Sequence, residues 1–237
     1  MYDNGTLYDL PELLAKNPYP GRGIVLGKTP DGHPLAMYFI MGRSENSRNR
    51  VFELDGDALR IGIHDQAKLG DASLILYQPV RVWDGQMIVT NGDQTDTIYE
   101  ALASGGTFVG ALNQRRHEPD APHFTPRISG LLPLDGQNVT LSVLRAGDAA
   151  GTRCDRLFFQ YDLAPGEGRF VHTYLGDGSP LPAFEGEPAR VNIPNDIPSF
   201  ADTVWHHLNE NNRVALYVYK NGQPARIYNR HATGGNA

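Results

Sequence analysis

Short apolar runs alternate with polar residues along most of the chain, and residues that favour turns separate one run from the next. The pattern predicts many short β-strands, because neighbouring side chains of a strand point to opposite faces of its sheet. A Pro-Asp-Gly turn at residues 30–32 predicts a hairpin between the first two strands. Strands are expected over residues 22–28, 35–42, 50–54, 58–63, 74–82, 86–90, 138–145, 154–162, 168–175, 213–219 and 225–229, with a further strand after the proline-broken loop that begins at residue 117.

Four stretches carry apolar residues at the spacing of a helix. The first, residues 7–16, is expected to form a short helix or a turn, and the other three cover residues 94–106, 107–116 and 199–209. We expect residues 91–93 to cap the second stretch and a double glycine to end it. Ser199 and Asp202 predict a capping box at the start of the last stretch. Residues 176–198 are expected to form a long surface excursion.

These elements together predict an α+β protein with many antiparallel strands and a few helices. Two packed sheets with the helices outside them would bury so many strands. Neither an internal repeat nor a linker-like segment is visible in the sequence. Residues 1–237 are therefore expected to form a single domain.

Composition and charge restrict the class of protein. Hydrophobic residues make up 40% of the 237 residues and charged residues 20%, as in ordinary soluble globular proteins. The net charge of −6 argues against a general nucleic-acid-binding surface. The single cysteine, Cys154, excludes an internal disulfide and a cysteine-rich zinc site. An anion site would therefore need a local concentration of arginines on an acidic protein.

The chain lacks the usual signals for export, membrane insertion and nucleotide binding. Its N-terminus has neither the basic start nor the apolar centre of a signal peptide, and no apolar run approaches membrane-spanning length. We therefore expect a cytoplasmic protein. The glycine-rich nucleotide motifs and the nucleophile motif of serine hydrolases do not occur.

A metal site is not expected. His117 and His123 lie near Glu118 and Asp120 in one loop and could bind zinc. Exposed polar residues of a loop are the preferred interpretation of these four side chains.

The strongest local signal for function is the sequence GRSENSRNR at residues 42–50, directly after an expected strand. It combines three arginines with two serines and two asparagines. Guanidinium groups match the oxygens of phosphate or carboxylate, and Ser and Asn supply further donors, so the segment could cradle an anion. A solvated polar loop explains the same residues equally well, and the segment alone does not decide between the two hypotheses.

Further polar residues cluster at the expected ends of strands. Arg22 lies between two glycines, which allow a ligand to approach closely, although tight packing explains them as well. Tyr77 would lie inside an apolar strand, where a core tyrosine is the common case. Glu118 is most simply a surface carboxylate paired with Arg115 or Arg116. Taken together, the arginines, a phenol and a carboxylate suit a phosphorylated substrate that undergoes proton transfer.

Several motifs, in their order along the chain, resemble the archaeal-type IMP cyclohydrolases. They are YPGRGIVLG, GRS…NR after a strand, LILYQPVR…IVTNGDQTDTI and HEPDAPHFTPRI. Members of that family convert 5-formamidoimidazole-4-carboxamide ribotide to inosine monophosphate (IMP) with loss of water. The resemblance implies this last step of de novo purine biosynthesis, a hydrolase acting on cyclic amidines, and a purine nucleotide as the small-molecule substrate.

The resemblance also implies a fold and a set of site residues. The family has the four-layer αββα sandwich of N-terminal-nucleophile hydrolases, and the first expected strand here holds no Ser, Thr or Cys that could act as such a nucleophile. The catalytic positions correspond to Arg50, Tyr77 and Glu118. The segment that ends at Arg50 is longer than in the archaeal proteins, so Arg48 stays an alternative to Arg50. The implied substrate-binding residues are Arg22, Arg43, Ser44, Arg48, Asn49, Asn91, Gly92, Thr95, Asp96, Thr125 and Arg127. The resemblance implies neither a metal nor a cofactor.

The implied reaction assigns a role to each group of residues. Because both reacting groups are on one ring, attack within the ring avoids a loss of translational entropy. We expect Arg50 and Tyr77 to stabilise the oxyanion and Glu118 to transfer the proton. The candidates for binding the 5′-phosphate are Arg22, Arg43 and Arg127, with supporting donors from Ser44, Asn91 and Thr95.

Two alternative functions stay open. Another amidohydrolase on the same fold would need a nucleophile at a free N-terminus. A non-catalytic purine-nucleotide-binding protein would need neither Tyr77 nor Glu118, because phosphate binding requires neither. We expect no nucleic-acid or membrane partner, and the sequence leaves open whether the protein forms a homo-oligomer.

Overall fold

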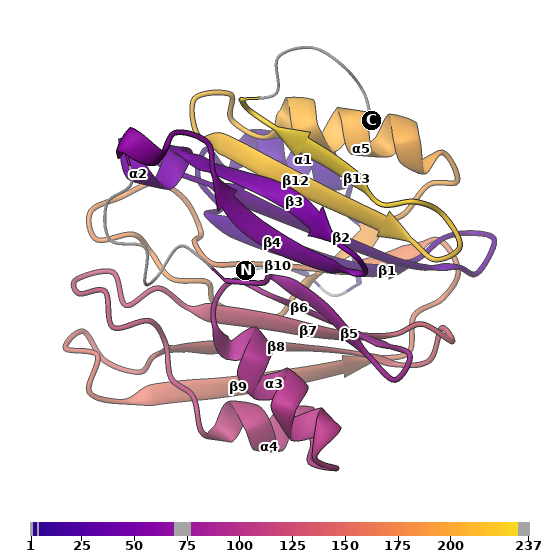
Figure 1. Ribbon diagram of the computed structural model, residues 1–237, viewed down its shortest axis with the longest axis horizontal. Coiled ribbons are helices and arrows are strands. Elements are labelled where there is room, and N and C mark those ends of the chain that lie inside the picture. The colour runs from indigo at the N-terminus through magenta and orange to yellow at the C-terminus, as the bar shows by residue number, and fades with distance from the viewer. Residues whose placement is uncertain (1, 4, 69–76, 232–237) are drawn as a thin grey trace.

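The computed structural model describes residues 2–3, 5–68 and 77–231 (Figure 1). Within them the chain forms two antiparallel sheets. The six-stranded sheet contains, in order across it, β11 (Ala189–Asn192), β10 (Glu167–His172), β1 (Arg22–Lys28), β2 (Pro34–Met41), β12 (Arg213–Lys220) and β13 (Arg226–Asn229). The seven-stranded sheet contains β3 (Arg50–Asp55), β4 (Ala58–Ile63), β5 (Val80–Trp83), β6 (Gln86–Thr90), β7 (Arg127–Pro133), β8 (Val139–Ala146) and β9 (Cys154–Tyr161).

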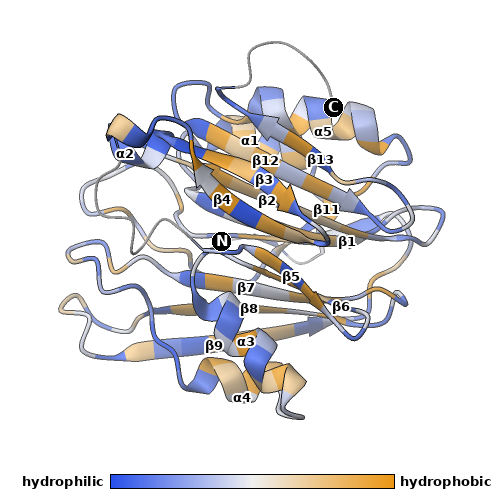
Figure 2. Cartoon of the chain, in the orientation of Figure 1, coloured by the Kyte–Doolittle hydropathy of each residue, from blue (hydrophilic) through white to orange (hydrophobic). Residues whose placement is uncertain are grey.

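The central strand β2 shows how the sheets are packed, because all of its residues are buried. Tyr38 and Ile40 point into the core between the two sheets. Met37 and Phe39, which alternate with them, point to the opposite face and pack in a second core under helices. A strand covered on both faces is a continuous apolar run, as MYFIM is here. Figure 2 shows hydrophobic residues along the strands and hydrophilic residues concentrated in the connecting loops.

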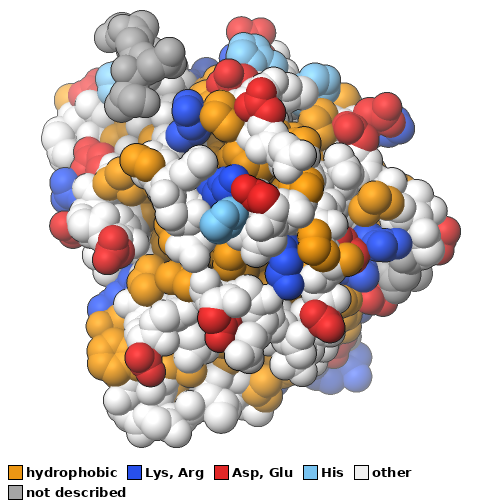
Figure 3. All heavy atoms as spheres, turned by 90° about the vertical axis from the view of Figure 1, so that its right-hand side faces the viewer, with side chains coloured by type: hydrophobic (Ala, Val, Ile, Leu, Met, Phe, Trp, Pro, Cys, Tyr) orange, Lys and Arg blue, Asp and Glu red, His pale blue; other side chains and the backbone are white. Residues whose placement is uncertain are grey.

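Helices cover the outer face of each sheet. The outer cores contain α1 (Leu10–Lys16) and α5 (Ile197–His207) on the six-stranded sheet, and α3 (Gln94–Ala103) and α4 (Phe108–Asn113) on the seven-stranded sheet. The layers are therefore helices, sheet, sheet and helices, and the predicted α+β sandwich of two antiparallel sheets is confirmed. Among the described helices, none combines the length and the apolar character needed to cross a membrane. On the face drawn in Figure 3, side chains of both charges are interspersed and do not gather into one basic surface.

Two short elements lie outside these layers. The single-turn helix α2 (Glu45–Arg48) stands between β2 and β3, and the 3₁₀ helix η1 (Gln66–Lys68) follows β4. Neither element is predicted by the pattern of the sequence. In α2, Ser44 is the N-cap residue and exchanges hydrogen bonds with Ser47, a capping box that allows one turn of helix within the polar segment.

The structure corrects three of the predicted elements. The strand expected over residues 74–82 begins only at Val80, because Pro79 has no N–H to donate to a ladder; residues 74–76 lie outside the described residues. The predicted capping box of α5 is wrong, since Asp196 caps the helix and Pro198 occupies its first turn. The predicted surface excursion 176–198 contains the edge strand β11.

Candidate active site

One cavity of about 300 Å³ lies where strands of both sheets begin or end. Arg22 is the first residue of β1 and Arg50 the first residue of β3, whereas Arg43 follows the end of β2. The loops before β7 and after β10 complete the wall. The lining residues are Tyr19, Arg22, Met41, Arg43, Ser44, Ser47, Arg50, Asp120, His123, Thr125, Tyr174 and Leu181.

The glycines beside Arg22 are explained by close packing. Gly21 has a φ of 76°, and a Cβ there would lie 2.3 Å from the Thr173 hydroxyl. A Cβ on Gly23 would lie 2.3 Å from the Phe39 ring. Of the two hypotheses for these glycines, the structure thus supports tight packing, which holds the start of β1 against the segment after β10.

Arg50 is fully buried at the inner end of the cavity. Its Nε donates to the carbonyl of Ser47 over 2.8 Å and its Nη2 to the carbonyl of Met41 over 3.2 Å. Its Nη1 is buried without a hydrogen-bond partner, as is Nε of Arg22. A buried guanidinium donor without a partner is costly. The two arginines therefore leave N–H donors that an anion could satisfy.

The charges of the two arginines are perturbed by their surroundings. Burial and the nearby Arg22 lower the pKa of Arg50. Burial also opposes the charge of Arg22, but Glu118 and the neighbouring tyrosines outweigh it and raise the pKa of Arg22. The surroundings therefore favour the charged form of Arg22, whereas the charge of Arg50 is opposed by burial and by the nearby Arg22.

Tyr77 and Tyr38 form a hydroxyl pair beside these arginines. Their oxygens are 2.7 Å apart, and the Tyr38 side chain is fully buried on the inner face of β2. Burial raises the pKa of Tyr77, although Arg22 and Arg50 lower it. Tyr77 lies in a bend and outside any strand, so its predicted place in the middle of a strand is wrong. Its hydroxyl stays protonated and can serve as a hydrogen-bond donor.

Glu118 is buried, with only 3% of its surface exposed. The surface pair considered for it does not form: Arg115 binds Asp93 over 2.5 Å, and Arg116 donates to backbone carbonyls of the loop 151–152. Burial raises the pKa of Glu118, and Arg22 and Arg127 offset this only in part. A buried carboxyl group with a raised pKa is suited to accept and return a proton near neutral pH.

A chain of hydroxyl groups closes the far wall of the cavity. Thr125 donates its hydroxyl proton to Asp120, whose other carboxylate oxygen accepts the backbone N–H of Thr125 over 2.7 Å. Because the Thr125 proton is engaged, the Tyr174 hydroxyl, 2.5 Å from the Thr125 oxygen, must donate to it. Tyr174 stacks on Tyr19. The tyrosine oxygen therefore retains lone pairs that can accept a hydrogen bond.

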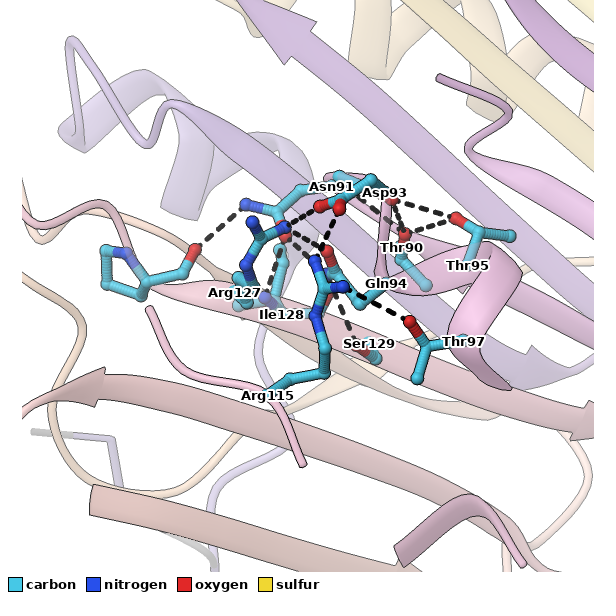
Figure 4. Close-up of polar contacts among 12 residues, drawn as sticks. Thr90, Asn91, Asp93, Gln94, Thr95, Thr97, Arg115, Arg127, Ile128 and Ser129 are labelled. Atoms are coloured by element: carbon cyan, nitrogen blue, oxygen red, sulfur yellow. Dashed lines mark hydrogen bonds and ion pairs between the residues drawn. The ribbon is translucent and has the colours of Figure 1, made fainter. Parts of the chain in front are cut away.

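Arg127 belongs to a hydrogen-bonded framework at the start of α3 (Figure 4). Its Nη1 contacts Asp93 Oδ1 and Gln94 Oε1, both at 2.6 Å. A Cβ on Gly92 would lie 2.5 Å from that nitrogen and 3.5 Å from Glu118 Oε1, so only glycine fits between them. Asp93 is the N-cap residue of α3 but makes no capping hydrogen bond.

Two further predicted site residues form the rest of this framework. Asn91 donates to the Pro126 carbonyl and accepts from Gln94 and from the backbone of Ile128. The hydroxyl of Thr95 lies 2.6 Å from that of Thr90. These contacts hold the start of α3 against β7 (Figure 4). Asn91 and Thr95 thus engage protein groups in this structure.

The remaining predicted site residues do not form one cluster. Arg43 binds Asp177 over 2.6 Å at the rim of the cavity and lies over the Tyr19 ring. The Asn49 side chain donates to the backbone carbonyl of Asp65 and accepts from its backbone N–H. Arg48 points to the other side of α2, and Asp96 forms an ion pair with Arg81. The expectation of a single cradle over residues 42–50 is therefore wrong for Arg48 and Asn49.

Several cavity residues were not identified from the sequence. Those in its wall include Tyr19, Asp120 and Tyr174, and Tyr38 is a further missed residue, which contacts Tyr77. A signal existed for Tyr19, which precedes the Pro-Gly-Arg-Gly turn, and for Asp120, which is five residues before Thr125 in the proline-rich loop. Tyr38 and Tyr174 carry no local signal, because apolar neighbours make both look like core residues.

No metal-binding arrangement is found in the described part of the chain, where no group of three or more His, Cys, Asp or Glu could hold an ion. His117 is buried and was wrongly expected to be exposed. Its Nδ1 donates to the carbonyl of Glu118 over 3.0 Å. His123 Nδ1 accepts the backbone N–H of Leu181 over 3.1 Å. Both imidazoles therefore form hydrogen bonds with backbone groups of the loops.

Fold and cavity together define a class: a sandwich of two antiparallel sheets with a cavity at the strand ends that is lined by arginines and tyrosines. The sequence model of the IMP cyclohydrolase-like protein family matches residues 19–223, which include every residue of the cavity. The chain belongs to this family.

Relatives with the same family name occur in several archaea. The chain is 34% identical over 126 residues to an IMP cyclohydrolase of Methanopyrus kandleri, which covers 52% of this chain and 62% of the relative. It is 33% identical over 116 residues to that of Methanocaldococcus jannaschii, covering 48% and 56%. The IMP cyclohydrolase of Thermococcus kodakarensis is 26% identical over 207 residues, covering 86% and 93%. The stronger similarity to the first two relatives thus spans under two thirds of their length.

Proposed function

We propose that the protein is an IMP cyclohydrolase, which closes the second purine ring of 5-formamidoimidazole-4-carboxamide ribotide to form inosine monophosphate. The observation that carries the proposal is the pair of buried arginines, Arg22 and Arg50, each with an unpartnered N–H donor. Beside them lie a protonated phenol, Tyr77, and a buried carboxyl group, Glu118, whose pKa is raised. Relatives that bear this enzyme's name support the assignment.

In the first step the carboxamide nitrogen forms a bond to the formyl carbon. The formyl oxygen becomes an alkoxide, and the nitrogen loses a proton. Arg50 Nη1 and the Tyr77 hydroxyl are the proposed donors to that alkoxide, because both are preorganised and lie where water has little access. Glu118 is the proposed acceptor of the nitrogen's proton.

In the second step Glu118 returns its proton to the oxygen. The nitrogen of the former formamido group then gives up its own proton, the leaving hydroxyl group takes up one proton, and a carbon–nitrogen double bond forms as the carbon–oxygen bond breaks and one water molecule leaves. Because burial raises the pKa of Glu118, its carboxylate is a stronger base than an exposed one, which suits the acceptance of the proton. Arg22 stabilises the ionised form of the carboxylate before the first transfer and after the second.

The 5′-phosphate is assigned to the outer part of the cavity. Arg43 and Ser44 lie there and are exposed, whereas Arg50 is enclosed. Arg43 would exchange Asp177 for the phosphate, a dianion that offers more oxygens to its guanidinium group. Arg127 is removed from the candidates for phosphate binding, because Asp93 and Gln94 already bind it.

We further propose that residues 1–237 form one domain whose four layers are those of the N-terminal-nucleophile hydrolases. The support is the shared inner core, which takes side chains from both sheets, and the helix pairs on both outer faces. The chemistry proposed here uses no N-terminal nucleophile.

Incubation of the purified protein with the formamido ribotide, without added metal, tests the activity. IMP should accumulate, followed by its absorbance, and mass spectrometry should show loss of one water from the substrate. A protein that binds IMP tightly but leaves the ribotide unchanged would instead be a nucleotide-binding protein on the same fold.

A further inference from the structure

A second and larger cavity, of about 530 Å³, lies on the opposite side of α2 from the active-site cavity. We call it the α2 pocket. Its wall includes Glu45, Arg48, His64, Lys68, Arg230 and His231. These residues come from α2, from the segment after β4 and from the segment after β13, so they are brought together only by the fold.

The α2 pocket carries arginines without carboxylate partners. Within the described residues, no Asp or Glu forms an ion pair with Arg48 or Arg230. Arg48 donates to the Gly42 carbonyl and the Asn212 amide oxygen. Arg230 donates through Nη1 alone to the carbonyls of Asn211 and Arg213, which leaves Nε and Nη2 for another acceptor. Burial and the nearby charges of Arg48 and Arg213 lower the pKa of Arg230.

Two histidines stand beside these arginines. The rings of His64 and His231 are stacked, with centroids 4.0 Å apart and planes 4° apart. His231 Nε2 donates to the carbonyl of Arg48 over 2.8 Å. Lys68 adds a further cation and forms an exposed ion pair with Glu45 over 2.7 Å. Three cations and two imidazoles therefore share the wall with two carboxylates, Glu45 and Asp65, on a protein whose net charge is −6.

We propose that the α2 pocket is a second binding site, which takes the phosphate group of a small phosphorylated metabolite. Phosphate oxygens would accept from Arg230 and Lys68 and would relieve the repulsion between the arginines. The cavity is larger than a phosphate ion needs and has the size of ordinary small-molecule sites, about 300–1,000 Å³. This inference does not rest on the proposed ring-closing activity.

The α2 helix forms a common wall of the two cavities. Ser44 and Ser47 face the active-site cavity, and Glu45 and Arg48 face the α2 pocket. The carbonyl of Ser47 also accepts the hydrogen bond that holds Arg50. A ligand that draws Arg48 toward the α2 pocket would therefore act on the backbone that positions Arg50.

Equilibrium dialysis with radiolabelled inorganic phosphate tests the second site. We expect two phosphates per chain for the wild type, and one for an Arg22→Ala/Arg43→Ala variant. Arg230→Gln should weaken the other phosphate about 10- to 100-fold, the effect of losing one charge-assisted hydrogen bond. Arg226→Gln, the same change at an exposed arginine of β13, is the matched control and should bind like the wild type.

A gain of affinity provides a test that does not depend on damage to the fold. Glu45→Gln removes a negative charge from the wall and frees Lys68, so phosphate should bind the α2 pocket more tightly. Competition with ribose 5-phosphate and with IMP distinguishes a site for free phosphate from one for a phosphorylated metabolite. The proposal is wrong if Glu45→Gln and a folded Arg230→Gln both bind phosphate like the wild type.

Discussion

Arg50 is the residue whose surroundings are hardest to explain by stability alone. A fully buried guanidinium group is ordinarily paired with a carboxylate, because removing the charge from water is costly. Arg50 donates hydrogen bonds to two backbone carbonyls, and another arginine lies close to it. Such an arrangement suits a site that meets its anion only when the substrate or its transition state is bound.

Tyr77→Phe tests the proposed oxyanion donor. The ring is retained, so the protein should fold normally, while kcat should fall by about 10²–10³ because one donor to the developing charge is lost. Steady-state kinetics of ring closure give the measurement. Tyr219→Phe makes the same chemical change outside the cavity and should have no effect. Normal turnover by Tyr77→Phe would make Tyr77 a structural residue.

Glu118→Gln tests the proposed proton transfer. The amide retains the shape of the side chain but cannot exchange the proton, so kcat should fall by about 10²–10⁴. Affinity for IMP should change far less, and the pH–rate profile should lose one limb. Arg115→Ala, which affects only the contacts to Asp93 and Thr97, is the comparison variant. A Glu118→Gln enzyme with the wild-type profile would exclude this role.

The same variant should reveal the burial of Glu118 in stability measurements. Since burial raises its pKa, the folded protein favours the protonated form, and the wild type loses stability as the pH rises through that pKa. Gln cannot ionise. Urea unfolding should therefore show that the free energy of unfolding of Glu118→Gln rises relative to that of the wild type as the pH increases from acidic to neutral. A difference between the two proteins that stays the same at every pH would contradict the raised pKa.

At the scale of elements, the active-site cavity depends on segments that side chains lock to one another. The start of α3 is held to β7 through Asn91, Gln94 and Arg127 (Figure 4). Arg127 is also one of the charges that act on Glu118. The edge strands β3 and β13, which belong to different sheets, are joined by Asn229. This amide accepts from the backbone N–H of Phe52 over 2.8 Å and donates to its carbonyl over 3.0 Å.

Asn229→Ala tests this connection between the sheets. Two hydrogen bonds to the backbone of β3 are lost, so the free energy of unfolding should fall by about 1–3 kcal/mol. Urea denaturation followed by circular dichroism gives the value. Asn211→Ala, a change of the same type at an exposed turn, should cost little. Equal stability of the two variants would show that β3 is held by packing alone.

At the scale of the whole molecule, His172 couples the six-stranded sheet to the N-terminal segment. Its Nδ1 donates to the carbonyl of Tyr174, so its Nε2 accepts the hydroxyl proton of Tyr2 over 2.7 Å. The ring is packed against Phe170 and Phe184. Burial lowers the pKa of His172 from 6.5 to about 4. The neutral imidazole is thus part of the folded core.

Acid should therefore destabilise the protein through His172. The unfolded chain takes up a proton below pH 6.5 and the folded chain only near pH 4, so stability is lost as the pH falls between these values, by about 3 kcal/mol. The free energy of unfolding, measured with urea across this range, should fall more steeply with decreasing pH for the wild type than for His172→Gln. His206→Gln, at an exposed position of α5, should keep the wild-type slope.

Local patterns in the sequence were sufficient for most of the secondary structure and for the sandwich. Three hairpins, with turns at Asp31, Asp55 and Asp84, follow from the turn-forming residues between their strands. Strand β2 follows from its unbroken apolar run. These features depend on residues close in the chain. The resemblance of motifs likewise led to the family, which the match over residues 19–223 establishes.

The grouping of the polar residues was decided only by the tertiary structure. One turn of helix turns Arg48 toward one cavity and Arg50 toward the other, although only one residue separates them. Tyr38, which looks like a core residue in the sequence, meets Tyr77 across a separation of 39 residues. Burial and charge at Glu118 likewise come from segments distant in the chain, because solvation and electrostatic interaction depend on proximity in space and not on proximity in sequence.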